Sequence, residues 1–180
     1  MGIEVSIVIP AYNEEERLGA TVREVLKYIA ETGRSAEVIV VDDGSSDRTA
    51  KVAEEAFGER PDVPGRVNRY EKNRGKGYAV KTGLLAAEGK IALFSDADLS
   101  TPIEEMPKLI DPIKAGEFDV TFGSRALDRS LIGTHQPWRR EQGGKVFNLV
   151  VRLMTGMPFW DTQCGFKLFT AAAAGETFST

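Results

Sequence analysis

The feature that most constrains the fold of this 180-residue chain is an alternation of short apolar segments with longer segments of helical periodicity. Continuous apolar runs such as residues 38–41 and 91–94 are typical of parallel strands that are covered on both faces. Between the runs, apolar residues recur at three or four positions, as at Leu18, Val22 and Val25, which indicates amphipathic helices. The alternation predicts an α/β fold with a doubly wound, mostly parallel sheet and helices on both faces.

The order of the expected elements follows from the same pattern. Strand and helix alternate four times, and a fifth strand and a final strand follow. We expect a helix that ends near residue 31, with Gly33 as its C-terminal cap. The strands are expected at residues 3–9, 38–41, 67–70, 91–94, 118–122 and 161–169, and the later helices at 49–57, 78–87 and 101–113.

Composition argues against several classes of protein. The net charge of −4 disfavours a nucleic-acid binder, because the chain has no overall basic field. Its one cysteine, Cys164, excludes an internal disulfide, and one cysteine with one histidine argues against a zinc site of the usual ligands. No apolar run approaches the roughly 20 residues that span a bilayer. Without a secretory signal, the expected compartment is the cytoplasm.

Three polar clusters directly follow apolar segments, at residues 10–14, 42–47 and 96–100. The carboxyl ends of parallel strands meet at one edge of a sheet, so we expect the clusters on the same rim. Open α/β sheets bind their ligands at this edge. Any one cluster is also explained by turn chemistry, since Asp and Asn are common turn residues. Three clusters together favour a nucleotide site.

Two carboxylates, Asp96 and Asp98, are separated by one alanine at the end of the apolar run 91–94. In an extended chain, residues two apart point to the same side, so both side chains would converge on one point. Hard carboxylate oxygens suit Mg²⁺ or Mn²⁺ carrying a diphosphate. The alternative is a turn that uses Asp as a turn residue and helix cap.

A basic, glycine-rich loop, Asn-Arg-Gly-Lys-Gly, lies at residues 73–77. Gly75 and Gly77 permit a close approach of the backbone to a ligand, and Lys76 or Arg74 offers positive charge to a phosphate. The spacing is not that of a Walker loop, and no GxGxxG follows the first strand. These absences argue against a P-loop ATPase and against a Rossmann dehydrogenase.

The character of the chain changes after Gly123. Residues 124–152 contain six basic and two acidic side chains, a local balance of +4 in a chain of net −4. Residues 146–154 predict a helix with a wide apolar surface and a polar stripe. That helix either packs in the core or lies on lipid headgroups.

These motifs, in this order, resemble the family 2 inverting glycosyltransferases with the GT-A fold. The resemblance rests on Ile-Pro-Ala-Tyr-Asn-Glu at residues 9–14, Val-Asp-Asp-Gly-Ser-Ser-Asp at 41–47, the loop at 73–77 and Asp-Ala-Asp at 96–98. Gly-Ser-Arg at residues 123–125 and the segment 161–167 are similar to the polyprenyl-phosphate glycosyltransferases within that family.

The resemblance implies a role for each matching position. The residues that would bind the nucleotide sugar are Pro10, Tyr12, Glu14, Asp42, Asp43, Lys76 and Asp96. Asp96 and Asp98 would hold Mg²⁺ or Mn²⁺. Ser100, which stands where related mannosyl enzymes have glutamine, would be the third ligand. Arg125 and one of Arg139 or Arg140 would bind the acceptor phosphate. The residues taken as catalytic are Asp161, Arg125 and Asp98.

The implied reaction is inverting transfer of a hexose, most simply glucose from UDP-glucose, to a dolichyl or other polyprenyl phosphate. The second pKa of a phosphate monoester lies near ~6, so this nucleophile is already charged and hardly needs a general base. Asp161 would then align the acceptor or assist electrostatically. Other readings are a soluble or saccharide acceptor, or a nucleotide-binding fragment without turnover.

The expected organisation is a single domain in two functional halves, shortened at its C-terminus. Residues 1–123 would bind the nucleotide sugar, and residues 124–180 would bind the acceptor through the basic segment and the amphipathic helix. Because the acceptor is a lipid, we expect a peripheral protein at the cytoplasmic face of a membrane.

Overall fold

The computed structural model describes residues 2–124 and 164–179. Arg125, Arg139, Arg140, Asp161 and the apolar segment 146–154 lie outside the described residues, so the predictions made for them stay predictions. The chain forms two compact units, Met1–Thr121 with Gly165–Thr180, and Phe122–Cys164. The polar clusters that follow the first, second and fourth strands belong to the first unit.

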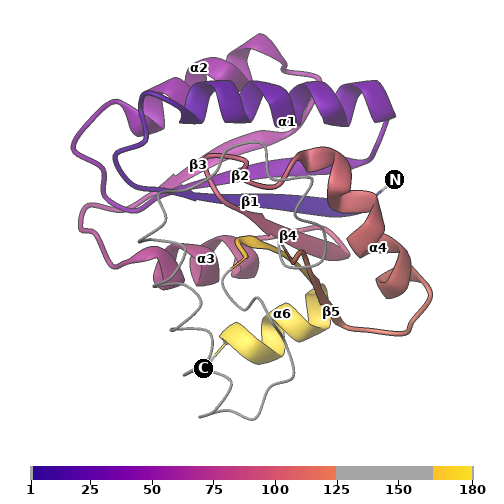
Figure 1. The fold of residues 1–180 in the computed structure, drawn as a ribbon. Coiled ribbons are helices and arrows are strands. Elements are labelled where there is room, and N and C mark those ends of the chain that lie inside the picture. Colours follow the sequence, from indigo (N-terminus) through magenta and orange to yellow (C-terminus); the bar gives the residue numbers. More distant parts are fainter. Residues whose placement is uncertain (1, 125–163, 180) are drawn as a thin grey trace, which may run out of the picture. The chain divides into compact units, whose positions relative to one another are not determined.

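The structure confirms the α/β class and the doubly wound, mostly parallel sheet. In the described part of the chain the strand order is β3-β2-β1-β4-β6-β5 (Figure 1). The strands are β1 (Val5–Ala11), β2 (Ala36–Asp42), β3 (Gly65–Arg69), β4 (Ile91–Ser95), β5 (Val120–Phe122) and β6 (Phe166–Thr170). The helices are α1 (Leu18–Thr32), α2 (Thr49–Glu59), α3 (Lys76–Leu85), α4 (Met106–Lys114) and α6 (Ala171–Phe178), with a 3₁₀ turn η1 (Ile103–Glu105).

The sheet is parallel from β3 through β4, and β6 then pairs antiparallel with β4. The final strand was expected, but its place between β4 and β5 was not. The strand β1 also continues through Pro10 to Ala11, whereas the sequence predicts an end at Ile9. Pairing with β4 stops at Val8, so Pro10 lies beyond the part of β1 that is flanked on both sides, where a missing N–H is tolerated.

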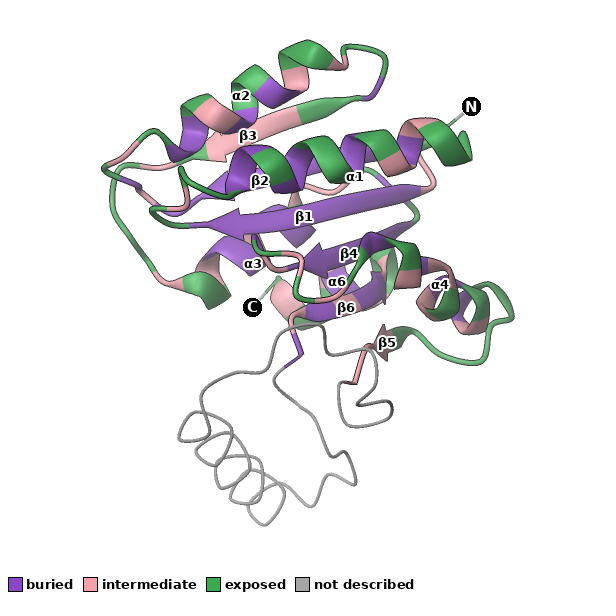
Figure 2. Ribbon diagram, turned by 45° about the horizontal axis from the view of Figure 1, so that its top comes forward, coloured by how far each residue is buried: buried purple, intermediate pink, exposed green. Residues whose placement is uncertain are grey.

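Helices cover both faces of the sheet, with α1 and α2 on one face and α3 and α6 on the other (Figure 1). Every residue of β1 and β2 is buried, as expected for strands covered on both sides (Figure 2). The predicted stripe of α1 is buried as well, and Gly33 ends that helix with a left-handed φ of 62°. A Cβ at Gly83 would lie 2.2 Å from Val8 Cγ1, so α3 packs directly on β1.

A buried carboxylate joins the amino-terminal ends of the parallel strands. Glu37, the second residue of β2, is completely buried and accepts hydrogen bonds from Ser6 Oγ (2.6 Å) and from the backbone N–H of Glu88 (2.8 Å). Arg66 of β3 donates to its second oxygen, Oε2. Gly89 donates its N–H to Ser6 Oγ (2.9 Å). The network connects three strands and the turn before β4, on the side opposite the polar clusters.

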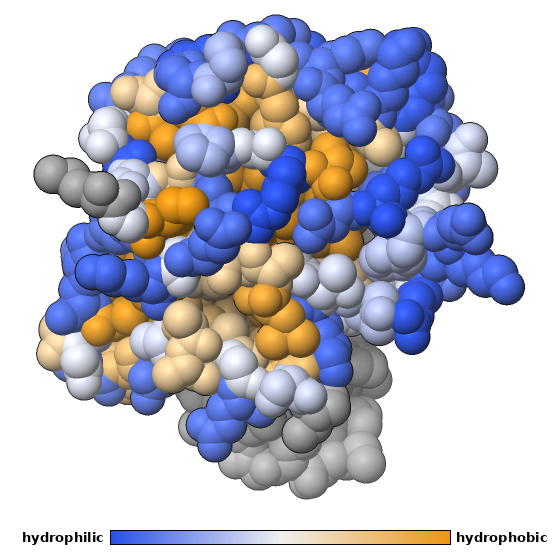
Figure 3. Space-filling view, turned by 180° about the vertical axis from the view of Figure 1, so that it is seen from behind, coloured by the Kyte–Doolittle hydropathy of each residue, from blue (hydrophilic) through white to orange (hydrophobic). Residues whose placement is uncertain are grey.

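Apolar side chains also reach the surface, among hydrophilic ones, as the view from behind shows (Figure 3). In the ranges that the structure describes, the exposed large apolar residues are Tyr12, Leu85, Phe118 and Val120. Among the same residues, no helix is both long and apolar enough to cross a membrane. Tyr12, which is 48% exposed, differs from the others in following β1 at the rim where the polar clusters gather.

Candidate functional site

The three polar clusters lie on one rim of the sheet, as predicted. They follow β1, β2 and β4, which are parallel neighbours, so their carboxyl ends point the same way (Figure 1). The basic glycine loop ends at α3, whose first residue is Lys76. The rim therefore gathers carboxylates, amides and a basic loop, the groups that a phosphorylated ligand with a metal ion requires.

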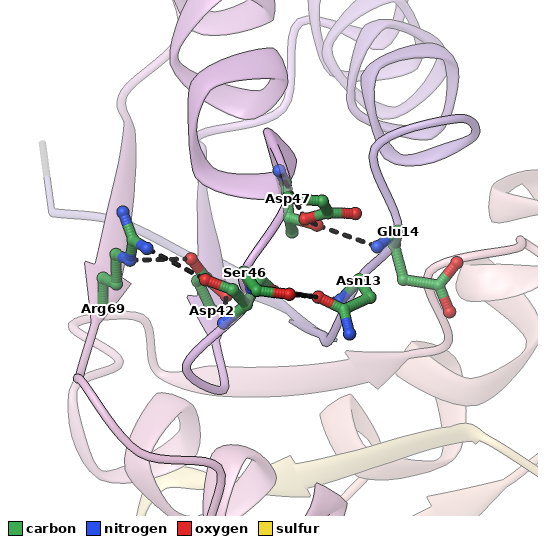
Figure 4. Close-up of polar contacts among 8 residues, drawn as sticks. Asn13, Glu14, Asp42, Ser46, Asp47 and Arg69 are labelled. Carbon is green, nitrogen blue, oxygen red and sulfur yellow. Dashed lines mark hydrogen bonds and ion pairs between the residues drawn. The ribbon is translucent and has the colours of Figure 1, made fainter.

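The loop after β1 and the loop after β2 are joined by hydrogen bonds in both directions (Figure 4). Ser46 donates its backbone N–H to Oδ1 of Asn13 (3.0 Å), and Glu14 donates its own to Oγ1 of Thr49 (2.8 Å). Asn13 has a φ of 54°, a left-handed conformation that asparagine tolerates better than most residues. Three further bonds are Asn13 N to Ser45 Oγ, Glu15 N to Asp47 Oδ2 and Arg48 N to Glu15 Oε2. Each loop thus fixes the backbone of the other.

Asp42, at the end of β2, is completely buried and connects the loop after β2 to Arg69 of β3. Its Oδ1 accepts the backbone N–H of Ser45 (2.9 Å), and its Oδ2 lies 3.1 Å from Arg69 Nε (Figure 4). Arg69 also donates to the carbonyl of Ser45 (3.0 Å). Both carboxylate oxygens therefore have partners within the protein, and sequence reasoning had no signal for Arg69.

Asp43 holds the basic glycine loop in place. Its side chain is buried, and its two oxygens accept the backbone N–H groups of Arg74 (2.7 Å) and Gly75 (2.9 Å). The loops come so close that a Cβ at Gly44 would lie 2.7 Å from the backbone nitrogen of Asn73, and Gly44 also has a φ of 71°. Asp43 and Gly44 therefore determine how the loop after β2 packs against the basic glycine loop at residues 73–77.

Asp43→Asn is expected to destabilise this contact. An amide offers only one oxygen, so one of the two backbone N–H groups loses its acceptor. Both bonds are only partly buried, so we expect a cost of about 1 kcal/mol, at the low end of the range for a buried donor. Urea unfolding would measure the loss, and hydrogen exchange of the Arg74 or the Gly75 amide, whichever loses its acceptor, should accelerate. Asn73→Ala is the matched control, because it removes only the 3.2 Å bond from Gly75 N to Asn73 Oδ1. Unchanged exchange of both the Arg74 and the Gly75 amide in Asp43→Asn would contradict the assignment.

The two cations of the glycine loop have different partners, a choice that the sequence left open. The guanidinium carbon of Arg74 lies 3.6 Å from the ring centroid of Tyr78, a cation–π contact. Tyr78 packs edge-on against Tyr70, and burial, with the Asp43 carboxylate nearby, raises the pKa of Tyr70 above its usual range. Lys76 Nζ instead lies 2.6 Å from Asp96 Oδ1. Lys76 is therefore the cation that reaches the acidic cluster.

Asp96 and Asp98 lie in a turn, so the expectation of an extended segment was wrong. The strand β4 ends at Ser95, and Leu99, with a φ of 44°, donates its N–H to the carbonyl of Asp96 (3.1 Å). Asp98 Oδ1 accepts bonds from Ser100 N (3.0 Å) and Ser100 Oγ (2.6 Å). Burial acts to raise the pKa of Asp98, but these bonds and the positive charge of Arg17 outweigh it and lower the pKa, so the carboxylate is ionised at neutral pH.

The chemistry of this cluster fits a divalent cation that is shared with a bound phosphate. Asp96 already attracts the ammonium group of Lys76, and Asp98 is an exposed, ionised carboxylate. Within the described residues, no group of three or more His, Cys, Asp or Glu side chains could hold a metal ion. A cation here would be coordinated by one or two carboxylates, by oxygens of the bound phosphate and by water, as Mg²⁺ usually is in proteins. Ser100, the residue expected as the third metal ligand, donates its hydroxyl to Asp98 Oδ1 in this structure.

The remaining predicted residues lie in different surroundings. Pro10 is buried within β1, whereas Tyr12 is exposed in the loop that follows. Glu14 Oε2 lies 2.5 Å from Arg17 Nε. The sequence reasoning assigned no role to Asn13, although it stands within the motif at residues 9–14 and its amide fixes the loop after β2. Of the predicted site residues that the structure describes, the structure thus brings those of the loops after β1, β2, β3 and β4 to one rim, and it shows that Asp42 and Asp43 also fix the loop backbones.

Comparison with known proteins gives a consistent result. The model of the family "Glycosyl transferase family 2" matches residues 6–176. Dolichyl-phosphate β-glucosyltransferase from Homo sapiens is 36% identical over 190 residues, covering 98% of this chain and 58% of that protein. The protein of the same name from Dictyostelium discoideum is 34% identical, covering 99% of this chain and 57% of that protein. The chain therefore spans somewhat more than half the length of these relatives.

Solved structures share the fold at lower identity. Mannosyl-3-phosphoglycerate synthase from Rubrobacter xylanophilus superposes with a TM-score of 0.67 at 21% identity, covering 94% of this chain and 53% of that chain. Glucosyl-3-phosphoglycerate synthase from Mycobacterium tuberculosis, in complex with Mn²⁺, UDP-glucose and glycerol 3-phosphate, gives a TM-score of 0.64 at 24% identity, covering 95% and 58%. At these identities the likeness establishes the fold.

Proposed function

The chain belongs to glycosyl transferase family 2 and has the expected GT-A fold, and on that premise we propose that it transfers a hexose from a nucleoside-diphosphate sugar to a polyprenyl phosphate. The proposed donor is UDP-glucose, and the proposed acceptor is dolichyl phosphate or a similar lipid. The reaction is a metal-dependent, inverting displacement at the anomeric carbon. It takes place at the surface of a membrane, with the protein at its cytoplasmic face.

The observation that carries this proposal is the identity to dolichyl-phosphate β-glucosyltransferases, which runs along almost the whole chain. Relatives of that name from four organisms are 34–38% identical over at least 98% of the chain. The motifs at the rim lie within this match. Polyprenyl phosphate is therefore a better-supported acceptor than a soluble sugar.

The donor diphosphate is proposed to bind at Asp96, Asp98 and Lys76. The two carboxylates would hold Mg²⁺ or Mn²⁺, which when bound neutralises charge on the departing nucleoside diphosphate. Lys76, at the first turn of α3, places a second positive charge beside Asp96. We assign the nucleoside to Pro10, Tyr12, Glu14, Asp42 and Asp43, through the loops that these residues shape. Tyr12 is the exposed aromatic ring of this group.

The acceptor phosphate is proposed to bind at Arg125 and one of Arg139 or Arg140. These arginines belong to the basic segment 124–152, with its balance of +4. A phosphate monoester is mostly dianionic at neutral pH, so the main task of the protein is to bring two anions together. Asp161 then aligns the acceptor and does not need to remove a proton. Residues 1–123 and 124–180 would serve donor and acceptor respectively.

A thermal-shift panel with UDP-, GDP- and dTDP-sugars, each with and without Mg²⁺ or Mn²⁺, tests the donor. Ligand at 100 times its Kd adds about 2.7 kcal/mol of stability. For a chain of this size that corresponds to a rise in Tm of roughly 5–10 °C. We expect UDP-glucose with a divalent cation to give the largest rise. A larger rise with a GDP- or dTDP-sugar, or no rise with any, would overturn the donor assignment.

The acceptor is tested by transfer of labelled glucose from UDP-glucose to dolichyl phosphate in liposomes. We expect product in the lipid phase, and co-sedimentation of the protein with the liposomes. Transfer to a soluble phosphate or saccharide in place of the lipid would favour a glycosyltransferase with a soluble acceptor. Binding of the nucleotide sugar without transfer to either acceptor would indicate a nucleotide-binding fragment.

A further inference from the structure

Gly165, which precedes β6, lies directly against the carboxylate of Asp96. A Cβ built on Gly165 would lie 2.0 Å from Asp96 Oδ2 and 2.2 Å from its Cγ. Side-chain atoms do not approach a Cβ so closely, so only glycine is compatible with this position of the carboxylate. Gly165 is not among the described glycines with a positive φ. The requirement is therefore one of space and does not come from backbone conformation.

The topology of the sheet brings these two residues together. The strand β6 runs antiparallel to β4, with Phe166 opposite Ser95. One step further, the backbone N–H of Asp96 donates to the carbonyl of Gly165 (3.1 Å). The same carboxylate contacts Lys76 Nζ at 2.6 Å. Asp96 is thus held by its backbone, and its side chain occupies the space that the glycine leaves.

We propose that Gly165 is a positioning residue for the cation and diphosphate site. Its missing side chain is what allows the Asp96 carboxylate to point where it does. A methyl group at this position would turn the carboxylate away. Because the displaced atoms are the end of a short side chain, the pairing of β4 and β6 would survive. The inference rests on the proposed function, since it assigns to Asp96 a role in binding the metal and diphosphate.

Gly165→Ala tests the proposal, with Gly175→Ala as the matched control. A Cβ at Gly175, in α6, would meet nothing within 4 Å, so this variant makes the same chemical change in open space. The measurement is calorimetric titration with UDP, once with Mn²⁺ and once with EDTA. We expect Mn²⁺ to strengthen UDP binding in the unchanged chain and in Gly175→Ala. In Gly165→Ala we expect that gain to fall at least tenfold.

The EDTA titration separates positioning from general damage. If Gly165 acts through Asp96 on the cation, the Kd for UDP in EDTA should change less than twofold in Gly165→Ala. Equal losses with Mn²⁺ and with EDTA would indicate a structural role and overturn the proposal. Retention of the full Mn²⁺ gain in Gly165→Ala would overturn it as well.

A ligand-free crystal structure of Gly165→Ala distinguishes failure of this inference from failure of the proposed function. We expect the Asp96 carboxylate to be rotated away from residue 165, with β4 and β6 still paired. A carboxylate that stays in place contradicts the positioning role whatever the protein binds. If the carboxylate rotates but Mn²⁺ does not affect UDP binding even in the unchanged chain, the proposed metal-dependent donor site is wrong. In that case the role of Gly165 in metal and diphosphate binding fails together with the proposed donor site, although its effect on the Asp96 carboxylate stands.

Discussion

Asp98→Ala is expected to lower the rate of sugar transfer by about 10³-fold while leaving the fold intact. A metal ion that neutralises developing charge contributes several kcal/mol to the transition state, and each 1.36 kcal/mol is a factor of ten in rate. Asp98 is exposed, and its hydrogen bonds at Oδ1 both come from the neighbouring Ser100. Its removal therefore disturbs little else. Transfer from UDP-glucose to dolichyl phosphate is the measurement, with the Tm as a check on folding.

Asp111→Ala is the matched control for this variant. Asp111 is an exposed aspartate in α4, which follows the acidic cluster in the chain, and we expect its replacement to leave the rate within twofold. Addition of a chelator to the unchanged protein should reproduce the loss seen in Asp98→Ala. Full activity in the presence of excess chelator would exclude a metal role for this residue.

Glu37→Ala is expected to lower the free energy of unfolding by about 2–4 kcal/mol, because each buried donor left without an acceptor costs about 1–3 kcal/mol, while the partly exposed Arg66 can still be hydrated. The substitution leaves the Ser6 hydroxyl, the Glu88 N–H and the Arg66 guanidinium without the acceptor that they share. Against a typical stability of 5–15 kcal/mol, this loss removes much of the margin. Urea denaturation followed by circular dichroism would measure it.

Two companion variants identify the cause of that loss. Glu88→Ala keeps the backbone N–H that binds Glu37 and removes only an exposed side chain 3.8 Å from Arg66, so we expect a change within about 0.5 kcal/mol. Combining Glu37→Met with Arg66→Met replaces the pair by apolar groups and should recover part of the stability lost in Glu37→Ala. If Glu37→Ala and Glu88→Ala cost the same, the buried network is not the source.

The strands, the helices and the shared rim could be predicted because each follows from a local pattern. Apolar runs indicated the buried strands, and helical periodicity indicated α1. Parallel order then placed the polar clusters on one edge without further information. The antiparallel insertion of β6 next to β4 could not be obtained in this way. Strand order within a sheet depends on pairing between segments that are distant in the sequence, and a local pattern contains no information about that pairing.

The details of the site escaped prediction for a similar reason. The sequence reasoning extended the strand geometry through Asp96 and Asp98, but the chain turns after Ser95. Glu37 stands one residue before the predicted strand at 38–41, and its burial depends on Arg66, 29 positions away. Charged residues are rarely buried unless they are paired, and the partner is visible only in three dimensions.

The nucleoside-binding roles expected of Asp42 and Asp43 stay predictions, but the structure adds a second role to each. Asp42 accepts a bond from Ser45 and pairs with Arg69, and Asp43 binds the backbone of Arg74 and Gly75. A variant at either position would change loop geometry as well as any contact with a nucleoside. Loss of activity in such a variant is therefore not evidence of direct binding.

The reciprocal bonds between residues 13–15 and 45–49 have a consequence for how such chains diverge. Main-chain groups of each loop depend on side chains of the other, so an insertion in one loop removes partners from both. The two segments should therefore be inherited together. A recombination breakpoint within α1 or β2 would combine loops that had never been selected as a pair. A chimera that exchanges residues 12–49 as one block keeps these partners and respects this constraint.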